Sequence, residues 1–248
     1  MNREWREILP MLHDTHCHVN LYPDQETVRE QIAADGMRVV HVTTSPAEFV
    51  DCRASQTCDT IELAAGLVPQ DILKLAPDVD MYLELLETCR FVGEVGLDYV
   101  TKDEQERLLQ RQVFERILGR CADLGGRVLT IHSRRATGDV IDMLRGFSGT
   151  PILHWFSGAV QEIESAPENL YFSLNTAMVK SRHGRDLIEA MNPDRLLLET
   201  DGPFVAVGDR PAVPRDVHRV VEFLAKQWAC GVGAVAARLS SNFARAIG

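Results

Sequence analysis

The sequence predicts an α/β protein of the (β/α)8 TIM-barrel class, folded as one domain over residues 1–248. Three observations predict this class. Eight short apolar runs recur along the chain, amphipathic helical segments separate them, and 248 residues suit a single barrel. Because each run is apolar on both faces, we expect a buried parallel strand at each. The runs lie at residues 12–16, 39–44, 61–68, 91–95, 128–132, 151–155, 170–174 and 196–199.

The segments between these runs carry helix signals. Residues 103–126 place apolar side chains at four-residue spacing and end in two glycines, which is typical of an amphipathic helix and its stop. Residues 27–36 and 184–195 end similarly, at Gly36 and at Asn192. After the eighth run, residues 215–228 and 233–247 are expected to form closing helices. The expected buried face of the longest helix consists of Leu109, Val113, Ile117 and Cys121.

The composition argues against some classes of protein. The net charge of −10 argues against a protein that coats nucleic acid by bulk attraction, but a whole-chain sum says little about an active site for phosphate esters. No apolar stretch reaches membrane-spanning length, so no membrane partner is expected. The six cysteines form no CxxC pair and the chain shows no secretory signal, so we expect reduced thiols and a cytoplasmic protein.

Polar side chains follow five of the eight runs, at the ends where TIM barrels place their active sites. Imidazole and carboxylate groups together suit divalent metal ions such as Zn, Mn or Mg. Because six ligands exceed the needs of one tetrahedral ion, we predict two ions with Glu94 as a bridge between them. One ion takes His16, His18 and Asp201, and the other takes His132 and His154.

Single histidines carry little weight in this prediction. A lone histidine after a strand is usually structural, and the HxH spacing of His16 and His18 is by itself a weak signal. The joint pattern of strand-end residues favours a metal site. His13 and His41 lie early in their runs and are expected in the core, and Cys17 is expected to point away from the metal ions.

Five motifs occur in an order and spacing that resemble the TatD family of metal-dependent deoxyribonucleases. They are "DTHCH", "GEVGLDY", "HSR", "HWFSG" and "ETDGPF", and the resemblance extends from about Asp14 to Phe243. The resemblance implies one metal-dependent hydrolase barrel, two divalent metal ions (Mg, Mn or Zn) and a cytoplasmic location. It also implies hydrolysis of DNA phosphodiester bonds, often as a 3′–5′ exonuclease.

The family's site residues carry over onto this sequence. Its metal ligands match the six strand-end residues named above. Glu94 and Asp201 are the implied catalytic residues, with Asp201 as the base that accepts a proton from the attacking water. Arg134 in "HSR" matches a family arginine that could face a phosphate, and a surface salt bridge is the alternative role.

A narrower resemblance is to the TatD-type component of the Qat anti-phage defence system. The stretches "HCHVNLYPD", "HVTTSP", "HWFSGA" and "ETDGPFVAVGDRPAVP" carry this resemblance. It implies other Qat proteins as partners, in addition to DNA as the substrate.

The sequence departs from the wider TatD family at two motifs. Val68 and Gln70 in "GLVPQ" replace the two histidines of a "GIHPH"-like turn. This change leaves the six ligands intact but puts a substrate or outer-shell contact in doubt. Gly202 in "ETDGP" replaces the serine of the commoner "ETDSP".

Two other functions stay open at the level of sequence. One is a metal-dependent amidohydrolase-type enzyme with a small substrate, although such relatives often carry a carbamylated lysine where Glu94 stands. The other is a nuclease fold that serves as a scaffold subunit of a defence complex. Trp155 and Phe156, beside His154, could stack on a base, but packing is the commoner role of aromatic residues.

Overall fold

Eight parallel strands in chain order define the architecture in a computed structural model that describes residues 3–55 and 58–248. Each strand lies on one of the eight predicted apolar runs. The (β/α)8 TIM-barrel class predicted from the sequence is therefore confirmed. The strands are β1 (His13–Cys17), β2 (Arg38–Val42), β3 (Ile61–Ala65), β4 (Phe91–Gly96), β5 (Val128–His132), β6 (Thr150–Leu153), β7 (Tyr171–Leu174) and β8 (Leu196–Leu198).

The third strand is shorter than its apolar run. β3 stops at Ala65 because the next backbone groups bond elsewhere: the N–H of Gly66 donates to Thr43 Oγ1 at 3.0 Å, and the N–H of Leu67 donates to the carbonyl of Glu94 at 2.9 Å. A side chain at position 66 would overlap the carbonyl of Thr43, so glycine is required there. The segment after β3 is therefore held beside Glu94.

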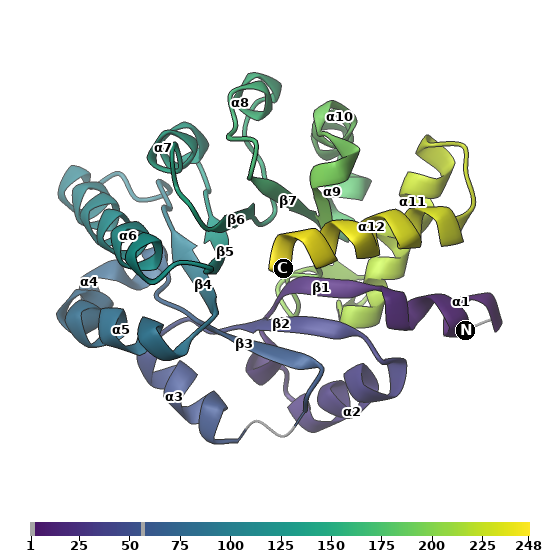
Figure 1. Cartoon of the computed structure of the whole chain (residues 1–248), viewed down its shortest axis with the longest axis horizontal. Helices are drawn as coiled ribbons and strands as arrows, with labels where there is room; N and C mark the ends of the chain where they lie inside the picture. The colour runs from purple at the N-terminus through teal and green to yellow at the C-terminus, as the bar shows by residue number, and fades with distance from the viewer. Residues whose placement is uncertain (1–2, 56–57) are drawn as a thin grey trace. The chain divides into compact units, whose positions relative to one another are not determined.

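The described residues form two compact units. The first unit comprises residues 3–41, 58–62 and 172–248 and contains β1, β8 and most of β2 and β7. Helix α12 runs beside β1 (Figure 1), where Phe243 stacks on the ring of His13 at a centroid distance of 4.3 Å. The other elements of this unit are α1 (Arg3–Ile8), α2 (Gln25–Asp35), α9 (Thr176–Lys180), α10 (Arg182–Ala190), α11 (His218–Gln227), α12 (Val232–Ile247) and a ribbon of β9 (Ala206–Val207) and β10 (Arg210–Pro211).

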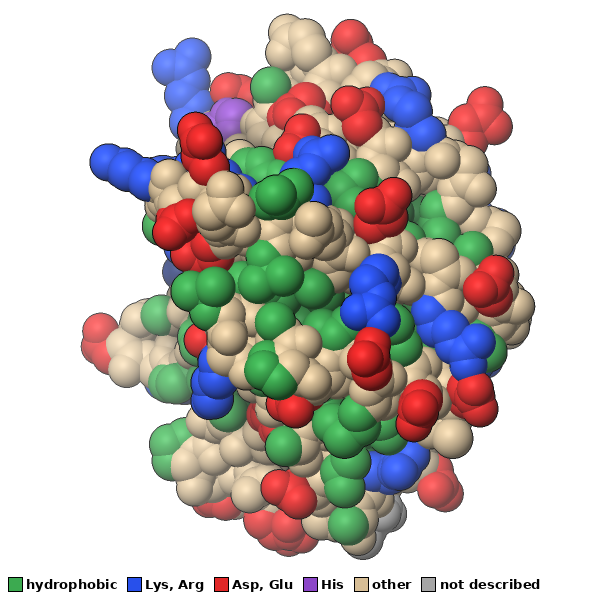
Figure 2. Space-filling model, turned by 90° about the vertical axis from the view of Figure 1, so that its left-hand side faces the viewer, with side chains coloured by type: hydrophobic (Ala, Val, Ile, Leu, Met, Phe, Trp, Pro, Cys, Tyr) green, Lys and Arg blue, Asp and Glu red, His purple; other side chains and the backbone are tan. Residues whose placement is uncertain are grey.

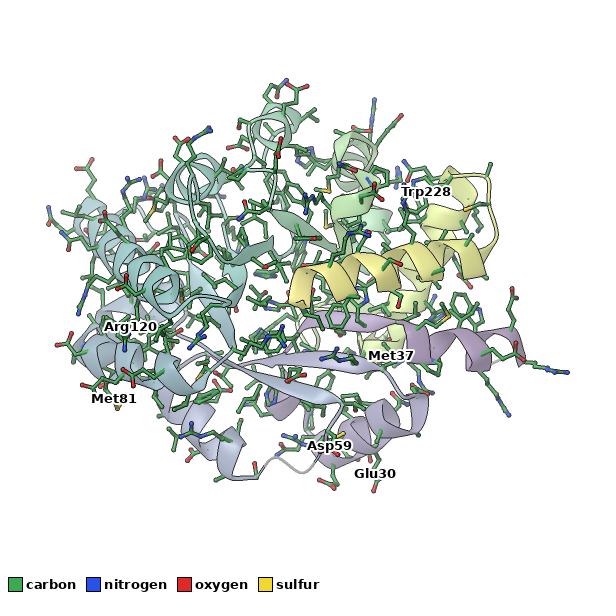
Figure 3. All side chains as sticks on the ribbon, viewed as in Figure 1. Glu30, Met37, Asp59, Met81, Arg120 and Trp228 are labelled. Carbon is green, nitrogen blue, oxygen red and sulfur yellow. The ribbon has the colours of Figure 1, made fainter. Side chains whose placement is uncertain are left out.

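The second unit comprises residues 42–55 and 63–171, with β4, β5 and β6 paired in parallel. Arg120 of α6 pairs with Glu87 and donates to the carbonyl of Leu83, which fastens α6 to the segment of α5 (Figure 3). The face that carries α4 to α6 mixes acidic and basic side chains and is not a basic surface (Figure 2). The helices of this unit are α3 (Pro46–Ala54), α4 (Ile72–Leu75), α5 (Val79–Leu85), α6 (Glu104–Leu124), α7 (Thr137–Met143) and α8 (Val160–Glu164).

The expectation of one domain over residues 1–248 stays a prediction. It includes residues 1–2 and 56–57, which lie outside the described residues.

The longest predicted helix is present, with one error in its buried face. α6 starts where the carboxylate of Asp103 accepts the N–H of Gln105, and it ends at Gly125 in the left-handed region. Val113, Ile117 and Cys121 are buried as predicted. Leu109 is only half-buried, and Gln110 is fully buried in its place. The reason lies in the bonds of the Gln110 amide, described below.

The remaining predicted helices are present with shifted ends. α2 ends before Gly36, as predicted, whereas α10 already ends at Ala190 and Asn192 caps the following turn instead. α11 and α12 are the two closing helices. Among the described residues, no single helix has the length and apolar character to cross a membrane. One pair bent by 114°, residues 214–227 with 232–247, meets the length and composition criteria when its two helices are taken together.

Candidate metal centre

The first unit brings together three of the predicted metal ligands. His16 lies on β1, His18 directly follows it, and Asp201 follows β8. One carboxylate oxygen, Asp201 Oδ1, lies 3.7 Å from His16 Nε2 and 3.8 Å from His18 Nε2. These distances are too long for hydrogen bonds. They suit donors on one ion, because ligands about 2.0–2.2 Å from a zinc-sized ion lie about 3–4 Å from one another. His16, His18 and Asp201 are called the first cluster.

A buried carboxylate sets the geometry of the first cluster through the main chain. Asp14 Oδ1 accepts the N–H of His16 at 3.1 Å and the N–H of Thr200 at 3.0 Å, while Oδ2 bonds the hydroxyl of Thr200. The N–H of Asp201 donates to the carbonyl of His16 at 2.9 Å. Burial raises the pKa of Asp14 to about 7, against the opposing effect of these hydrogen bonds. β1 and the end of β8 are therefore held in one register.

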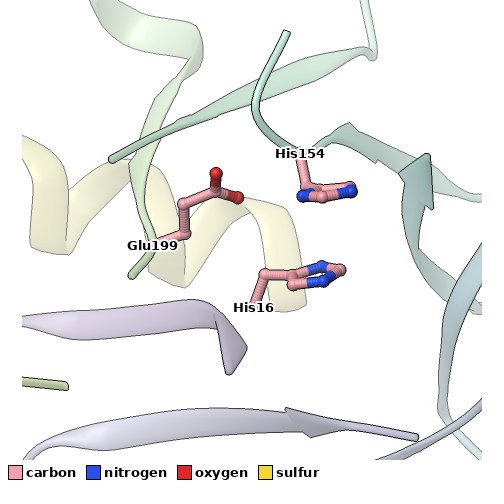
Figure 4. Close-up of side chains that lie close together, drawn as sticks. All are labelled: His16, His154 and Glu199. Atoms are coloured by element: carbon pink, nitrogen blue, oxygen red, sulfur yellow. The ribbon is translucent and has the colours of Figure 1, made fainter. Parts of the chain in front are cut away.

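Glu199, which the sequence analysis treated only as the last residue of a strand, also lies beside the first cluster. It is fully buried, and ligand atoms of His16 and Glu199 lie within 4.8 Å of each other (Figure 4). Its carboxyl group accepts a hydrogen bond from Asn175 Nδ2 at 2.8 Å and bonds the hydroxyl of Ser173. Burial, followed by the charge of Asp201, raises the pKa of Glu199 well above its usual range. An acidic residue at the end of an all-leucine strand was the signal that could have identified it.

The second unit brings together the other three predicted ligands, on neighbouring strands. Glu94 is on β4, His132 ends β5, and His154 follows β6. Glu94 Oε1 lies 2.7 Å from His132 Nδ1 and 3.2 Å from His154 Nε2, and the two nitrogens are 3.2 Å apart. These three atoms form a compact triangle of the donor types that zinc and manganese bind. Glu94, His132 and His154 are called the second cluster.

The charges of the second cluster depend on one another. Burial alone would raise the pKa of Glu94, but hydrogen bonds with His132 and His154 hold it well below its usual range. Burial would lower the pKa of His132, but hydrogen bonds with Asp98 and Glu94 raise it to about 9. For His154, burial prevails and lowers the pKa. Glu94 is thus an anion, as a metal ligand must be.

A side-chain relay, which the sequence analysis missed, supports His132 from behind. Asp98 Oδ2 lies 2.9 Å from His132 Nε2, the ring nitrogen that faces away from Glu94. The buried Gln110 of α6 accepts the N–H of Asp98 at 2.9 Å, and its amide donates to the carbonyls of Asp98 at 3.1 Å and Pro69 at 3.2 Å. A carboxylate on the outer nitrogen of a metal-binding histidine fixes the ring and its tautomer. Asp98 and Gln110 are therefore positioning residues for His132.

The departure at "GLVPQ" has a visible consequence. The side chain of Val68 is apolar and buried, so it replaces the first family histidine without a polar contact. Gln70 is exposed, and its Nε2 lies 3.4 Å from His132 Nε2, the atom that Asp98 also contacts. Because Asp98 accepts the hydrogen of that nitrogen, the Gln70 amide N–H group is a polar neighbour of His132 and not its hydrogen-bond partner.

Arg134 lies on the exposed surface directly after β5. The alternative role of a salt bridge is not observed, since Arg134 forms no ion pair with any residue that the structure describes. Burial would raise the pKa of Asp98, but its bond with His132 and, less strongly, the charge of Arg134 lower it. The charge of Arg134 therefore acts on Asp98, the carboxylate behind His132, and its contact with phosphate stays a prediction.

The aromatic candidates differ in accessibility. Phe156 is 1% exposed and packs in the core, which is the commoner role given for it above. Trp155 is 37% exposed. His13, His41 and Cys17 are buried, as expected for core residues.

Gly202 follows Asp201 and has no room for a side chain. A Cβ atom there would overlap the hydroxyl of Tyr22, which donates a hydrogen bond to the carbonyl of Ala212. The carbonyl of Ala212 lies 2.5 Å from the same Cβ position, so the serine of the commoner family motif requires a shift of both Tyr22 and the main chain at Ala212.

Comparison with known families identifies the chain. The family described as "TatD related DNase" matches residues 13–248. The chain belongs to the TatD family. Its TatD fold agrees with the crystal structure of YJJV, a TatD homologue from Escherichia coli K12, with a TM-score of 0.84 at 22% identity over 96% of this chain and 98% of that one.

Several relatives of this TatD-family chain carry names that specify a reaction. A putative deoxyribonuclease TATDN1 homologue of Encephalitozoon cuniculi is 29% identical over 58% of this chain, and the match spans 52% of that relative. The uncharacterized metal-dependent hydrolase YabD of Bacillus subtilis is 27% identical over 79% of this chain and 81% of its own length. The 3′–5′ ssDNA/RNA exonuclease TatD of Musicola paradisiaca is 33% identical over 51% of this chain and 47% of its own length. The TatD-family chain is thus a hydrolase enzyme with candidate metal-binding groups of histidine and glutamate.

Proposed function

We propose that this chain is a metal-dependent DNase that hydrolyses DNA phosphodiester bonds and degrades strands from the 3′ end. The observation that carries the proposal is that each unit holds a buried cluster of imidazole and carboxylate donors within ligand distance of one another. Membership of the TatD family supports the reaction, and the name of the Musicola relative supports the polarity.

Each cluster has a defined role in the proposal. His16, His18 and Asp201 hold one divalent ion, and Glu94, His132 and His154 hold another, with Mg, Mn or Zn as candidates. When bound, such ions polarise phosphoryl oxygens and lower the pKa of water. Asp201 accepts the proton of the attacking water, and Arg134 contacts the phosphate. The sharing of Glu94 between two ions stays a prediction from the sequence.

The direct test is cleavage of end-labelled single-stranded oligonucleotides with Mg or Mn and with EDTA. We expect metal-dependent shortening from the 3′ end. The variant His16→Ala/His18→Ala is expected to be inactive, whereas His183→Ala, which changes an exposed histidine, should match the wild type. Cleavage that persists in EDTA or in the double variant would contradict a metal-dependent DNase.

We further propose that the activity serves anti-phage defence together with other Qat proteins. The resemblance of four sequence stretches supports this proposal. The test is phage plating on cells that carry the complete system with either the wild-type chain or Glu94→Ala. Loss of protection in the variant is expected. Retained protection with stable, abundant variant protein would instead favour a scaffold role.

A further inference from the structure

Phe204 is the one exposed phenylalanine of the chain. Of the nine phenylalanines, all within the described residues, seven are buried and Phe223 is half-buried, whereas Phe204 is 63% exposed. Exposure of a large apolar ring to water is unfavourable. A single such side chain is common on protein surfaces and needs no explanation by itself. The position of Phe204 beside the first cluster, however, requires an explanation.

The ring of Phe204 is held in place next to a predicted metal ligand. It packs against His18 in an edge-to-face arrangement, with a centroid distance of 5.0 Å and an interplanar angle of 82°. The N–H of Phe204 donates to the carbonyl of Asp201 at 2.9 Å, so the main chain ties it to a second ligand.

The segment after Phe204 is anchored as well. Val205, Val207 and Ala212 form a small buried cluster at the β9–β10 ribbon, and the N–H of Ala212 donates to the carbonyl of Val205 at 2.8 Å. An ordered backbone therefore presents this ring to solvent directly beside the first cluster.

We propose that Phe204 is a stacking platform for an unpaired nucleobase near the end of the strand whose phosphate lies at His16, His18 and Asp201. This inference rests on the proposed function and adds to it a residue that binds the terminal base of a single strand. An aromatic ring accepts the face of any base, so stacking binds single strands without reading their sequence. Bases within a duplex have both faces covered, so a double-stranded end has to fray before its base meets the ring.

The first experiment uses two oligonucleotides that differ in one ring. One ends in thymidine, and the other ends in 5,6-dihydrothymidine, which keeps the hydrogen-bonding groups but lacks the aromatic ring. The wild type is expected to prefer thymidine in kcat/KM by about 10-fold, within the range of about 5- to 150-fold measured for the loss of single base–aromatic stacks. Phe204→Leu should show a KM for thymidine ends raised by a similar factor and should no longer distinguish the two oligonucleotides. Phe204→Tyr should retain the preference.

Leu73→Ala is the matched control, because Leu73 is a 67% exposed apolar side chain on α4. We expect it to leave KM and the preference for thymidine unchanged. The metal content of each variant, measured by mass spectrometry, should equal that of the wild type. If Phe204→Leu keeps both the KM and the preference, the inference is overturned.

A binding measurement separates failure of the inference from failure of the proposed function. Asp201→Asn is expected to bind DNA without cleaving it, and stacking quenches the fluorescence of 2-aminopurine placed at each of the last three positions of the oligonucleotide. Quenching at one position that is lost in Asp201→Asn/Phe204→Leu supports the platform even if the wild type cleaves no DNA. Equal quenching with and without Phe204, or none at any position, contradicts it, whatever the nuclease assay shows.

Discussion

The two clusters use the same kinds of donor but hold them in different ways. In the first cluster, Asp14 bonds the backbone N–H groups of His16 and Thr200, so the main chain keeps the ligands about 3.7–3.8 Å apart. In the second cluster, Glu94 and the imidazoles bond one another directly, at 2.7 and 3.2 Å. Side chains from outside, Asp98 and Gln110, then fix the ring of His132.

This difference indicates which residues each cluster depends on. The backbone hydrogen bonds of the first cluster are broken only when the register of β1 and β8 changes. Substitutions that break them, such as those of Asp14, should therefore lower the free energy of unfolding. A relay of side chains can be weakened one group at a time while the fold persists. Substitutions around the second cluster should therefore change metal affinity before they change the free energy of unfolding.

The largest effect is expected for the ligands themselves. Glu94→Ala and His16→Ala should each reduce kcat on single-stranded DNA by about 1,000-fold or more, because each removes a donor from a centre that stabilises several kcal/mol of transition-state charge. Single-turnover assays at saturating metal would measure this loss. If one of the two variants kept substantial activity, only the other cluster would be essential. The proposal that both clusters take part in catalysis would then be wrong.

The next effect concerns the relay. Asp98→Asn should weaken metal binding at the second cluster by about 10- to 100-fold, as is typical for loss of a carboxylate behind a metal-binding histidine. Titration of metal-free protein against a chelating dye would measure it. The control is Gln112→Leu, an exposed position on α6, the helix that carries Gln110, and this variant should bind metal as the wild type does. An unchanged affinity in Asp98→Asn would show that Asp98 does not position His132.

The third effect is a pH dependence of stability in the first unit. Burial, and next the charge of Arg38, lowers the pKa of His13 to about 3, and its Nε2 accepts the N–H of Leu198 at 3.0 Å. The unfolded chain binds a proton below about pH 6.5 and the folded chain does not, so stability falls as the pH drops from about 6.5 towards 3. Between pH 8 and pH 5 this residue alone should remove about 2 kcal/mol.

Urea unfolding of the wild type and His13→Gln at pH 8 and pH 5 would measure this contribution. Glutamine keeps an acceptor for Leu198 and does not titrate, so the variant should lose less stability on acidification. Parallel pH dependences of the two proteins would assign the effect to other groups, of which His41, with a pKa lowered to about 3 by burial, is the nearest equivalent.

The smallest effect is expected at Gln70. Its contact with His132 is long, at 3.4 Å, and Gln70 is exposed. Gln70→Ala should therefore change metal affinity by less than about 2-fold, because two N–H donors do not form a hydrogen bond. Gln70→His restores the family residue. It should show whether an imidazole at position 70 competes with Asp98 for the hydrogen bond with His132 Nε2. A loss in Gln70→Ala as large as that in Asp98→Asn would make Gln70 the main support of His132.

The sequence predicted the parts of the site that follow from strand ends. Each of the six proposed ligands lies at or close to the carboxyl end of an apolar run, and parallel strands place such residues at one edge of a sheet. The eight runs themselves were readable because strands buried on both faces have to be apolar along their whole length.

The sequence did not predict the parts that depend on contacts between distant segments. The four-residue spacing in α6 placed Leu109 in the core, yet Gln110 is buried instead because its amide bonds the carbonyls of Asp98 and Pro69. The burial of Gln110 in place of Leu109 is favoured only in the folded protein, where the loops after β3 and β4 supply these carbonyls. Asp98 was missed for the same reason, since its carboxylate gains its role from a histidine 34 positions later.

Gly202 and Tyr22 form a pair of positions that have to change together. The phenol oxygen of Tyr22 occupies the volume that a side chain at position 202 would need, and it bonds the carbonyl of Ala212 from there. A relative with serine at position 202 has to carry a smaller or differently placed side chain at position 22. Exchanges at these two positions should therefore be correlated across the family. Replacement of Tyr22 alone relieves only part of the overlap at position 202, because the carbonyl of Ala212 lies 2.5 Å from the same Cβ position.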